Sequence, residues 1–198
     1  MAPDPGARAT YLAYRAGSVA ARALPGPMAG ALAVALGRVA PVVLPGRRRM
    51  AARHQRRAAP GGDADGSVDA AVRGAFESYA RYWLEIFRLP GATPDSLDER
   101  FSIEGYEHLE AALAAGRGVV CALPHLGGWE WGGAWIASRG HTPLAVVEPV
   151  EPPALFEWFV RQRAALGMEV VALGATRRRC CSRLCGTTGS SPWSVIAT

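Results

Sequence analysis

The spacing of apolar side chains divides the chain into a helical first part and a second part in which short strands alternate with helices. Helical spacing predicts helices over residues 10–23 and 28–44, and from Ser67 to about Arg88. The third of these helices carries an apolar row made of Val72, Phe76, Tyr79, Trp83 and Phe87. Such a row is typical of core packing, and the alternative is that Tyr82 or Trp83 lines a groove for a lipid chain.

The second part contains short apolar runs, several of them rich in β-branched residues, separated by helical patterns. The predicted strands cover residues 101–103, 118–123, 143–147 and 169–173. The predicted helices between them cover residues 106–115, 129–138 and 153–166. This alternation predicts an α/β fold with a largely parallel sheet flanked by helices.

Charge is distributed unevenly along the chain. All 22 basic residues are arginine, and residues 1–60 hold ten of them against a single acidic residue, whereas residues 61–176 hold eight against sixteen. The densest group consists of Arg47, Arg48, Arg49, Arg53, Arg56 and Arg57. Each basic residue near an anionic bilayer contributes about 1 kcal/mol to binding, so this group predicts attachment to a membrane surface. A solvated helix face is an alternative, and a nucleic-acid patch is disfavoured because no aromatic residues alternate with the arginines.

The amino-terminal apolar stretch falls short of the roughly 18 to 20 uninterrupted apolar residues of a transmembrane helix. Arg38 and Pro41 break the segment Met28–Leu44, and Leu24–Pro27 interrupts the approach to it. We therefore predict two interfacial helices rather than a membrane span. A basic start followed by a small-residue cleavage site, as in a signal peptide, is not found. The expected location is peripheral, on the cytoplasmic face of the plasma membrane.

A histidine and a carboxylate lie five residues apart where a predicted strand turns into a helix. His125 follows the apolar strand, Gly127 and Gly128 provide the turn, and Glu130 falls in the first turn of the helix. Ligands of open α/β sheets bind at the carboxyl ends of the strands, and a helix start offers free backbone N–H groups. Residues five apart on one helix would lie about 140° apart, so the pair meets only if His125 is in the loop.

This arrangement suits acyl transfer. An imidazole with an ordinary pKa of about 6.5 is suited to proton transfer near neutral pH, so His125 is a candidate general base for an acceptor hydroxyl. Glu130 would accept a hydrogen bond from the other ring nitrogen and stabilise the imidazolium. The N–H groups of Gly127, Gly128 and Trp129 would bind the tetrahedral oxyanion. The alternative is that His125 only caps the helix.

The cysteines are weaker candidates than His125 and Glu130 for a chemical role, either as a nucleophile or as metal ligands. Cys121 lies within an apolar strand, where a buried thiol is usually inert. Cys180, Cys181 and Cys185 lack a fourth ligand at zinc spacing, so we predict no metal site.

The His-x4-Glu pair resembles the H-x4-D/E motif that glycerolipid and lipid A type acyltransferases share. The flanking segments Arg81–Pro90 and Ile103–Gly118, then Glu148 and Arg163–Gly167, stand in the same order as in phosphatidylinositol mannoside acyltransferases. The resemblance covers roughly Tyr11–Gly174. It implies a glycerolipid acyltransferase-like fold preceded by interfacial helices.

The resemblance also implies a reaction, in which a fatty acyl group passes from an acyl-CoA co-substrate to a mannose hydroxyl of a phosphatidylinositol mannoside. No metal or other cofactor is implied. Glu148 and Arg163 match family positions near the active cleft, where we expect them to orient the acceptor sugar or the donor phosphate, and surface ion pairing is the alternative for both. Two other functions stay open: a lipid A type lauroyl acyltransferase, and a non-enzymatic basic protein that binds membrane surfaces.

The carboxyl end departs from this pattern, because residues 177–198 hold three of the four cysteines and no periodic apolar spacing. Back-translation into codons rich in G and C yields a second frame that reads as an amphipathic helix and a strand ending in Asp-Arg-Asp, as in resembling proteins. We therefore predict a frameshift near residues 175–179. The expected regions are membrane-interface helices with the basic cluster (1–62), the first part of the acyltransferase domain (63–176) and an aberrant tail (177–198). The C-terminal half of the fold is then expected to be missing and the activity impaired.

Overall fold

The structure is a computed structural model that describes residues 4–58, 67–123, 127–173 and, for the backbone alone, 194–197. The chain forms two compact units. One is the helical unit Gly17–Arg88, and the other is an α/β unit that combines Met1–Ala16 with Leu89–Thr198. The predicted division at residues 62 and 176 stays a prediction.

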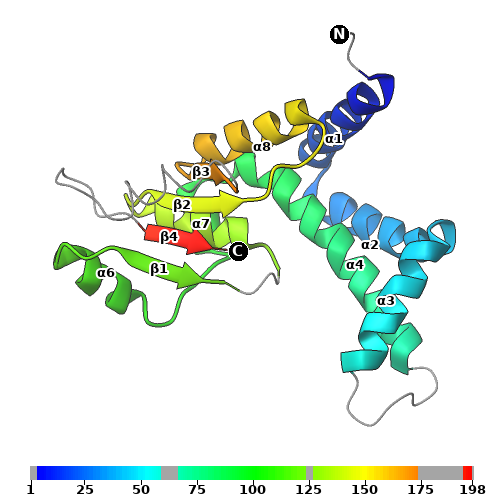
Figure 1. Ribbon diagram of the computed structural model, residues 1–198, viewed down its shortest axis with the longest axis horizontal. Helices are drawn as coiled ribbons and strands as arrows, with labels where there is room; N and C mark the ends of the chain where they lie inside the picture. Colours follow the sequence, from blue (N-terminus) through cyan, green and yellow to red (C-terminus); the bar gives the residue numbers. More distant parts are fainter. Residues whose placement is uncertain (1–3, 59–66, 124–126, 174–193, 198) are drawn as a thin grey trace. The chain divides into compact units, whose positions relative to one another are not determined.

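Helices make up most of the described chain (Figure 1). They are α1 (Pro5–Ala23), α2 (Gly26–Val43), α3 (Pro45–Ala58), α4 (Ser67–Arg88), a 3-10 turn (Leu89–Gly91), α5 (Pro94–Asp98), α6 (Tyr106–Ala114), α7 (Trp129–Ser138) and α8 (Pro153–Ala165). The strands are β1 (Val119–Ala122), β2 (Pro143–Val147), β3 (Glu169–Ala172) and β4 (Ser194–Ala197).

In the helical unit, α2 packs along α4. The C-terminal end of α4 contacts the C-terminal end of α1 through Arg88. The Arg88 guanidinium donates hydrogen bonds to the carbonyl oxygens of Ala21 and Leu24, at 2.5 and 2.8 Å. Carbonyls in the last turn of a helix have no partner within the helix, so this side chain supplies one. The predicted core row of α4 is only partly correct: Val72 is buried, whereas Tyr79 is 59% exposed.

Helix α2 differs from the expectation that Pro41 and Arg38 would break the apolar segment. It continues through Pro41, which stands in its last turn and is buried. A proline there costs one hydrogen bond to the preceding turn without ending the helix at once. Among the described residues, α2 is the one helix long and apolar enough to cross a membrane by length and composition. Length and composition do not distinguish a span from an interfacial helix, so the predicted interfacial position stays a prediction.

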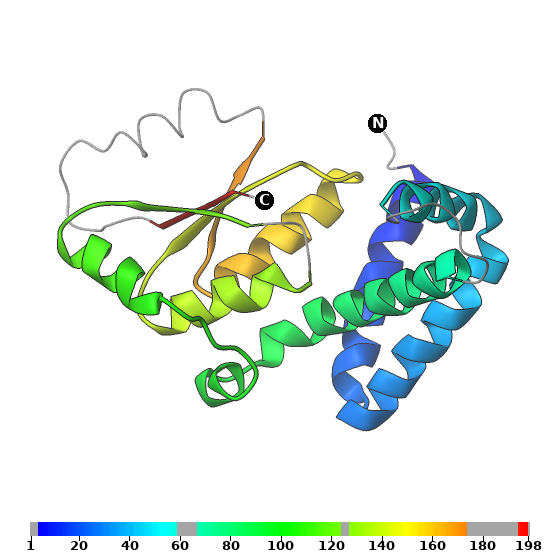
Figure 2. The same cartoon turned by 90° about the horizontal axis from the view of Figure 1, so that it is seen from below.

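The strands that the structure describes in the α/β unit pair in parallel, in the order β1-β4-β2-β3, in agreement with the predicted largely parallel sheet. Helices α6, α7 and α8 lie on one side of it (Figure 2). The predicted strands at 118–123, 143–147 and 169–173 and the helices that connect them are confirmed. A parallel pair of strands needs such a crossover, usually a helix, to return the chain to the same end of the sheet.

Two strand predictions differ from the structure. Residues 101–103 form no strand, because Phe101 and Ile103 instead pack against the buried cluster around Trp135 of α7. Conversely, β4 was not predicted: Val195 pairs with Val120 of β1 and with Leu144 of β2. Pairing with two distant strands leaves no periodic signal in a four-residue segment.

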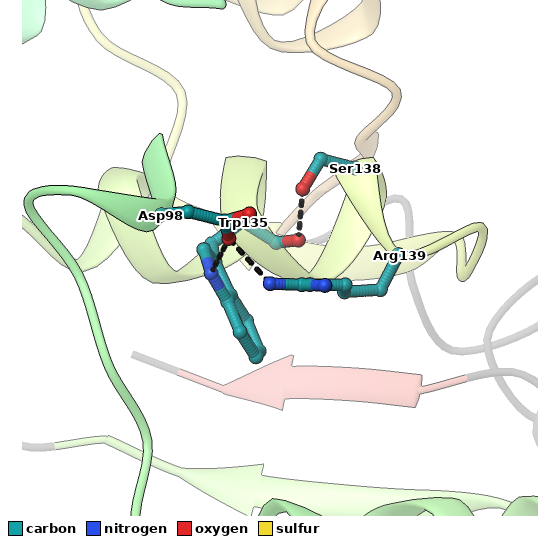
Figure 3. A network of polar contacts seen from close by, with 4 residues as sticks. All are labelled: Asp98, Trp135, Ser138 and Arg139. Atoms are coloured by element: carbon teal, nitrogen blue, oxygen red, sulfur yellow. Dashed lines mark hydrogen bonds and ion pairs between the residues drawn. The ribbon is translucent and has the colours of Figure 1, made fainter. Parts of the chain in front are cut away.

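A polar network around Trp135 joins α5 to α7 (Figure 3). Asp98 accepts a hydrogen bond from Trp135 Nε1 at 2.7 Å and another from Arg139, whose guanidinium lies 4.6 Å from the centre of the Trp135 ring. Ser138 Oγ donates to the Trp135 carbonyl oxygen at 2.7 Å. These contacts fix the C-terminal end of α7, the helix that begins at the candidate site.

Candidate functional site

The last two residues of the turn before α7 are the glycines that the sequence analysis assigned to it. Gly127 has φ +63°, a left-handed conformation that favours glycine, and Gly128 is the residue that caps α7. The helix then begins at Trp129, so Glu130 stands in its first turn. His125 lies outside the described residues.

Glu130 is buried and paired with a residue from another helix. It is 2% exposed, and its Oε1 accepts a hydrogen bond from Arg163 Nη2 of α8 at 3.0 Å. The side chain of Arg163 is 15% exposed. Because water is nearly excluded, the attraction between the two charges is stronger than at a surface. Removing either side chain would leave the other charge buried without a partner, which is strongly destabilising.

Aromatic rings flank Arg163 and fix its position. Its guanidinium carbon lies 5.3 Å from the centre of the Trp129 ring and 5.6 Å from that of Phe159. Both distances fall within the range of cation–π attraction. Trp129 thus contributes its side chain to holding the pair, in addition to the backbone N–H that the sequence analysis assigned to it.

One polar atom on each partner has no hydrogen-bond partner among the described residues: Glu130 Oε2 and Arg163 Nε. A buried carboxylate oxygen without a donor is costly, and buried polar atoms in folded proteins are almost always paired. Glu130 Oε2 is therefore a buried acceptor to which no described residue donates.

The start of α7 presents free backbone donors. Trp131 N–H bonds to the Gly128 carbonyl oxygen at 2.9 Å, whereas the N–H groups of Gly128, Trp129 and Glu130 bond to no acceptor within the described part of the chain. The first N–H groups of a helix lack intrahelical partners and carry partial positive charge. They are available to an anion or to a developing oxyanion.

Glu148 lies directly after β2, on the edge of the sheet where the carboxyl ends of the strands meet. It is exposed, in contrast to Glu130. Neither this position nor the ion pair of Arg163 tests the predicted roles in orienting a sugar or a phosphate, which stay predictions.

Cys121 is half-buried in β1, and burial raises the pKa of its thiol. A raised pKa leaves less of the nucleophilic thiolate at neutral pH, which agrees with reading this residue as structural. The described residues contain no group of three or more His, Cys, Asp or Glu side chains placed to hold a metal ion. Cys180, Cys181 and Cys185 lie outside them.

The six arginines of the basic cluster all lie on α3, and no residue of this helix is buried. Arg48 forms an ion pair with Asp69 of α4 at 3.0 Å. The cluster is thus a solvated helix face, compatible with either the membrane or the plain surface interpretation.

The helical unit contains an apolar cavity of about 340 Å³ between α1, α2 and α4. Trp83 lines it and Tyr82 does not. Its other lining residues are Gly17, Ala20, Ala21, Leu24, Ala29, Leu32, Ala33, Leu36, Ala80, Leu84 and Phe87. A cavity of this size and apolar lining is suited to a hydrocarbon chain.

The pairing of Glu130 with Arg163 was missed from the sequence. The two residues are 33 positions apart, on helices separated by β2, so no local spacing connects them. The one indication in the sequence was that Arg163 follows Phe159 by one helical turn, so that a charged side chain shares a face of α8 with an apolar one.

Curated relatives of this chain carry one activity in their names. A phosphatidylinositol mannoside acyltransferase of Mycobacterium tuberculosis (strain CDC 1551 / Oshkosh) is 43% identical over 106 residues, which cover 52% of this chain and 34% of the relative. The protein of that name from Mycolicibacterium smegmatis (strain ATCC 700084 / mc(2)155) is 41% identical over 110 residues, 56% of this chain and 36% of the relative. The chain thus covers about a third of the length of these relatives.

The family-level match is longer than either pairwise match. The sequence model of the bacterial lipid A biosynthesis acyltransferases matches residues 6–185, which include the whole helical unit and the α/β unit as far as β3, but not β4. Together with the named relatives, this match shows that the chain belongs to the bacterial lipid A biosynthesis acyltransferase family.

Proposed function

We propose that this chain takes part in moving a fatty acyl group from acyl-CoA to a mannose hydroxyl of a phosphatidylinositol mannoside. The acceptor is taken from the names of the relatives. The observation that carries the chemistry is the buried Glu130, which keeps one oxygen unpaired in the first turn of α7, five residues after His125.

In the proposed reaction, His125 takes the proton from the acceptor hydroxyl as its oxygen attacks the thioester carbonyl carbon. The carbonyl oxygen becomes an oxyanion, and the free N–H groups at Gly128 and Trp129 donate to it. When the intermediate collapses, the C–S bond breaks, and the imidazolium returns its proton to the leaving thiolate. An ester and free coenzyme A result, so no oxidant or metal is consumed.

Glu130 orients the base in this mechanism. Its Oε2 would accept a hydrogen bond from the His125 ring nitrogen that is not facing the hydroxyl, which fixes the tautomer and stabilises the imidazolium. Arg163 occupies Oε1 at 3.0 Å, so that Oε2 is left for the histidine. Glu148, exposed at the same sheet edge, is the proposed contact to the sugar.

The reaction would take place at the cytoplasmic face of the plasma membrane, with the protein attached peripherally. The arginines of α3 would contact anionic headgroups there. The cavity of the helical unit, lined by Trp83, is the proposed site for a hydrocarbon chain of a substrate.

The test is acyl transfer from radiolabelled acyl-CoA to phosphatidylinositol mannoside, with lipid A precursor as a second acceptor. Glu130→Gln keeps the shape of the side chain and removes its charge, and we expect a loss of about 100-fold or more in kcat with little change in KM. Glu157→Gln on α8 is the matched control, because Glu157 forms an exposed ion pair with Arg161. Equal activity of the Glu130→Gln and Glu157→Gln variants would contradict the proposed role of Glu130. Acylation of the lipid A precursor but not of phosphatidylinositol mannoside would show that the proposed acceptor is wrong.

The predicted frameshift is tested separately by sequencing the gene across the codons for residues 174–193. A changed frame would supply the intact enzyme for the assay. An unchanged frame would mean that the assay is run on the chain as it stands, and turnover by that chain would contradict the expected impairment.

A further inference from the structure

The ion pair between Glu130 and Arg163 lacks the second hydrogen bond that would complete it. Arg163 Nη2 donates to Glu130 Oε1 at 3.0 Å, while Arg163 Nε and Glu130 Oε2 are buried and bond to no described residue. One of these two atoms carries a donor N–H, and the other is an acceptor. The Nε and Nη2 groups of a guanidinium form a fork that matches both oxygens of a carboxylate, so a two-point contact would pair both atoms.

Leaving both atoms unpaired is costly, so another interaction has to hold the guanidinium away from the two-point contact. A buried donor or acceptor without a partner loses its hydrogen bonds to water and gains none in return. A single contact is ordinary for a more exposed pair, such as Arg38 with Glu77, because water bonds to the remaining atoms. At Glu130, which is 2% exposed, solvent offers little compensation.

Two aromatic rings supply that interaction. The guanidinium carbon of Arg163 lies 5.3 Å from the centre of the Trp129 ring of α7 and 5.6 Å from that of the Phe159 ring of α8. A planar, weakly hydrated guanidinium is attracted to aromatic rings, and this attraction is stronger away from water. Both aromatic residues are 8% exposed, so the attraction acts in a nearly dry environment.

Packing holds the two rings themselves in place. Trp129 belongs to a buried cluster with Ala145 of β2 and Met168. Phe159 packs against Tyr14 of α1 in a T-shaped arrangement, with the ring centres 5.9 Å apart. Each ring is thus fixed by a different neighbour, and a guanidinium attracted to both rings has a defined position relative to the carboxylate.

We propose that Trp129 and Phe159 are positioning residues, which restrict Arg163 to one oxygen of Glu130 and thereby keep Oε2 as an acceptor for His125. A guanidinium bound to both oxygens would preserve the charge of the carboxylate but occupy the oxygen that orients the base. This inference rests on the proposed function, in which Glu130 acts on His125, and adds the two side chains that keep Glu130 available to the base.

The direct test is the proton resonance of the Arg163 Nε–H group in the full chain with isotope-labelled arginine. The signal is assigned as the one that Arg163→Lys removes. Phe159→Leu keeps an apolar side chain but removes the ring, so we expect the resonance to move downfield as Nε–H bonds to Glu130. Phe156→Leu is the matched control, because Phe156 also lies on α8 and the described structure places its ring in no cation–π contact with Arg163. It should leave the resonance in place.

The consequence for the reaction is measured by acyl transfer to phosphatidylinositol mannoside. Phe159→Leu should lower kcat about tenfold without changing KM, a smaller loss than that expected for Glu130→Gln. Phe159→Tyr keeps the ring and should retain kcat within about twofold of the unaltered chain. Combined with Arg163→Lys, Phe159→Leu should cost no further activity, because an ammonium group has no planar fork to place on the two oxygens.

Thermal melting verifies that each variant is folded, and Trp129→Leu is expected to move the same resonance should Phe159→Leu fail to fold. A resonance that Phe159→Leu leaves in place, or that Phe156→Leu moves equally, would overturn the positioning role. A shifted resonance without a loss of kcat, in an enzyme that Glu130→Gln inactivates, would overturn the need for a free oxygen. Full turnover by Glu130→Gln would instead contradict the proposed function, whatever the resonance shows.

Discussion

The two units of this chain place charge and apolar surface in opposite ways. In the helical unit Gly17–Arg88, large apolar side chains of α2 are exposed, and the ion pair of Arg38 is largely exposed as well, with 68% of the arginine side chain accessible. In the α/β unit, the apolar residues of α7 are buried, and the ion pair of Glu130 is buried with them. The contrast teaches that exposure alone does not separate apolar from charged side chains here: one unit leaves apolar side chains accessible, and the other encloses a charged pair among apolar ones.

The largest effect is expected from the buried pair. Arg163→Met should lower the free energy of unfolding by about 3–5 kcal/mol, because it leaves the Glu130 carboxylate buried without its partner. Arg161→Met, on the same helix, removes an exposed pair with Glu157 at 3.6 Å and should cost at most about 1 kcal/mol. Urea unfolding of both variants compares them, and similar losses would show that burial of the pair is not what stabilises this unit.

A smaller effect is expected where α2 meets α4. Gly37→Ala should destabilise the helical unit by about 1–3 kcal/mol, because the added methyl group overlaps the α4 backbone. Gly30→Ala on the same helix meets no atom within 4 Å and should stabilise it by up to about 1 kcal/mol through helix propensity. Thermal melting gives both values, and stabilisation by Gly37→Ala would contradict the close approach of the helices.

The exposed pair of the helical unit should matter least to stability. A double-mutant cycle on Arg38→Ala and Glu77→Ala should give a coupling of about 0.2–1 kcal/mol, falling with added salt, because the arginine is solvated. A coupling as large as that expected for Glu130 and Arg163 would remove the contrast between the two units.

The reactivity of the Cys121 thiol tests burial within the α/β unit without a mutation. Burial raises the pKa of the Cys121 thiol, so less thiolate is present at a given pH than in the unfolded chain. The rate of alkylation by iodoacetamide, followed by mass spectrometry of the peptide that contains Cys121, should rise at higher pH in the folded chain than in urea. Identical pH profiles would mean that β1 does not shield this thiol.

The sequence was sufficient for the elements whose signals are local. The turn before α7 could be placed because Gly127 and Gly128 interrupt the apolar pattern, and α4 because its apolar residues repeat with helical spacing. Helix α3 also carried a signal that was not used, namely Pro45 at its start followed by strong helix formers.

Features that depend on distant residues could not be predicted. Residues 101–103 have the composition of a strand, but their apolar side chains are taken up by the Trp135 cluster. The ion pair of Arg163 with Glu130 joins two helices that are adjacent only once β2 has brought α8 beside α7. In both cases tertiary packing, rather than local preference, decides the outcome.

The position of β4 has a consequence for the order in which the molecule is assembled. The strand that holds β1 and β2 together is the last of the described elements to be synthesised, so both strands leave the ribosome with an edge that nothing yet pairs. The α/β unit therefore depends on a late, long-range pairing, which slows folding, whereas every helix of the stretch Gly17–Arg88 is already present when residue 88 has been added. During translation the helical unit can thus fold before β4, which lies between β1 and β2 in the sheet, has been synthesised.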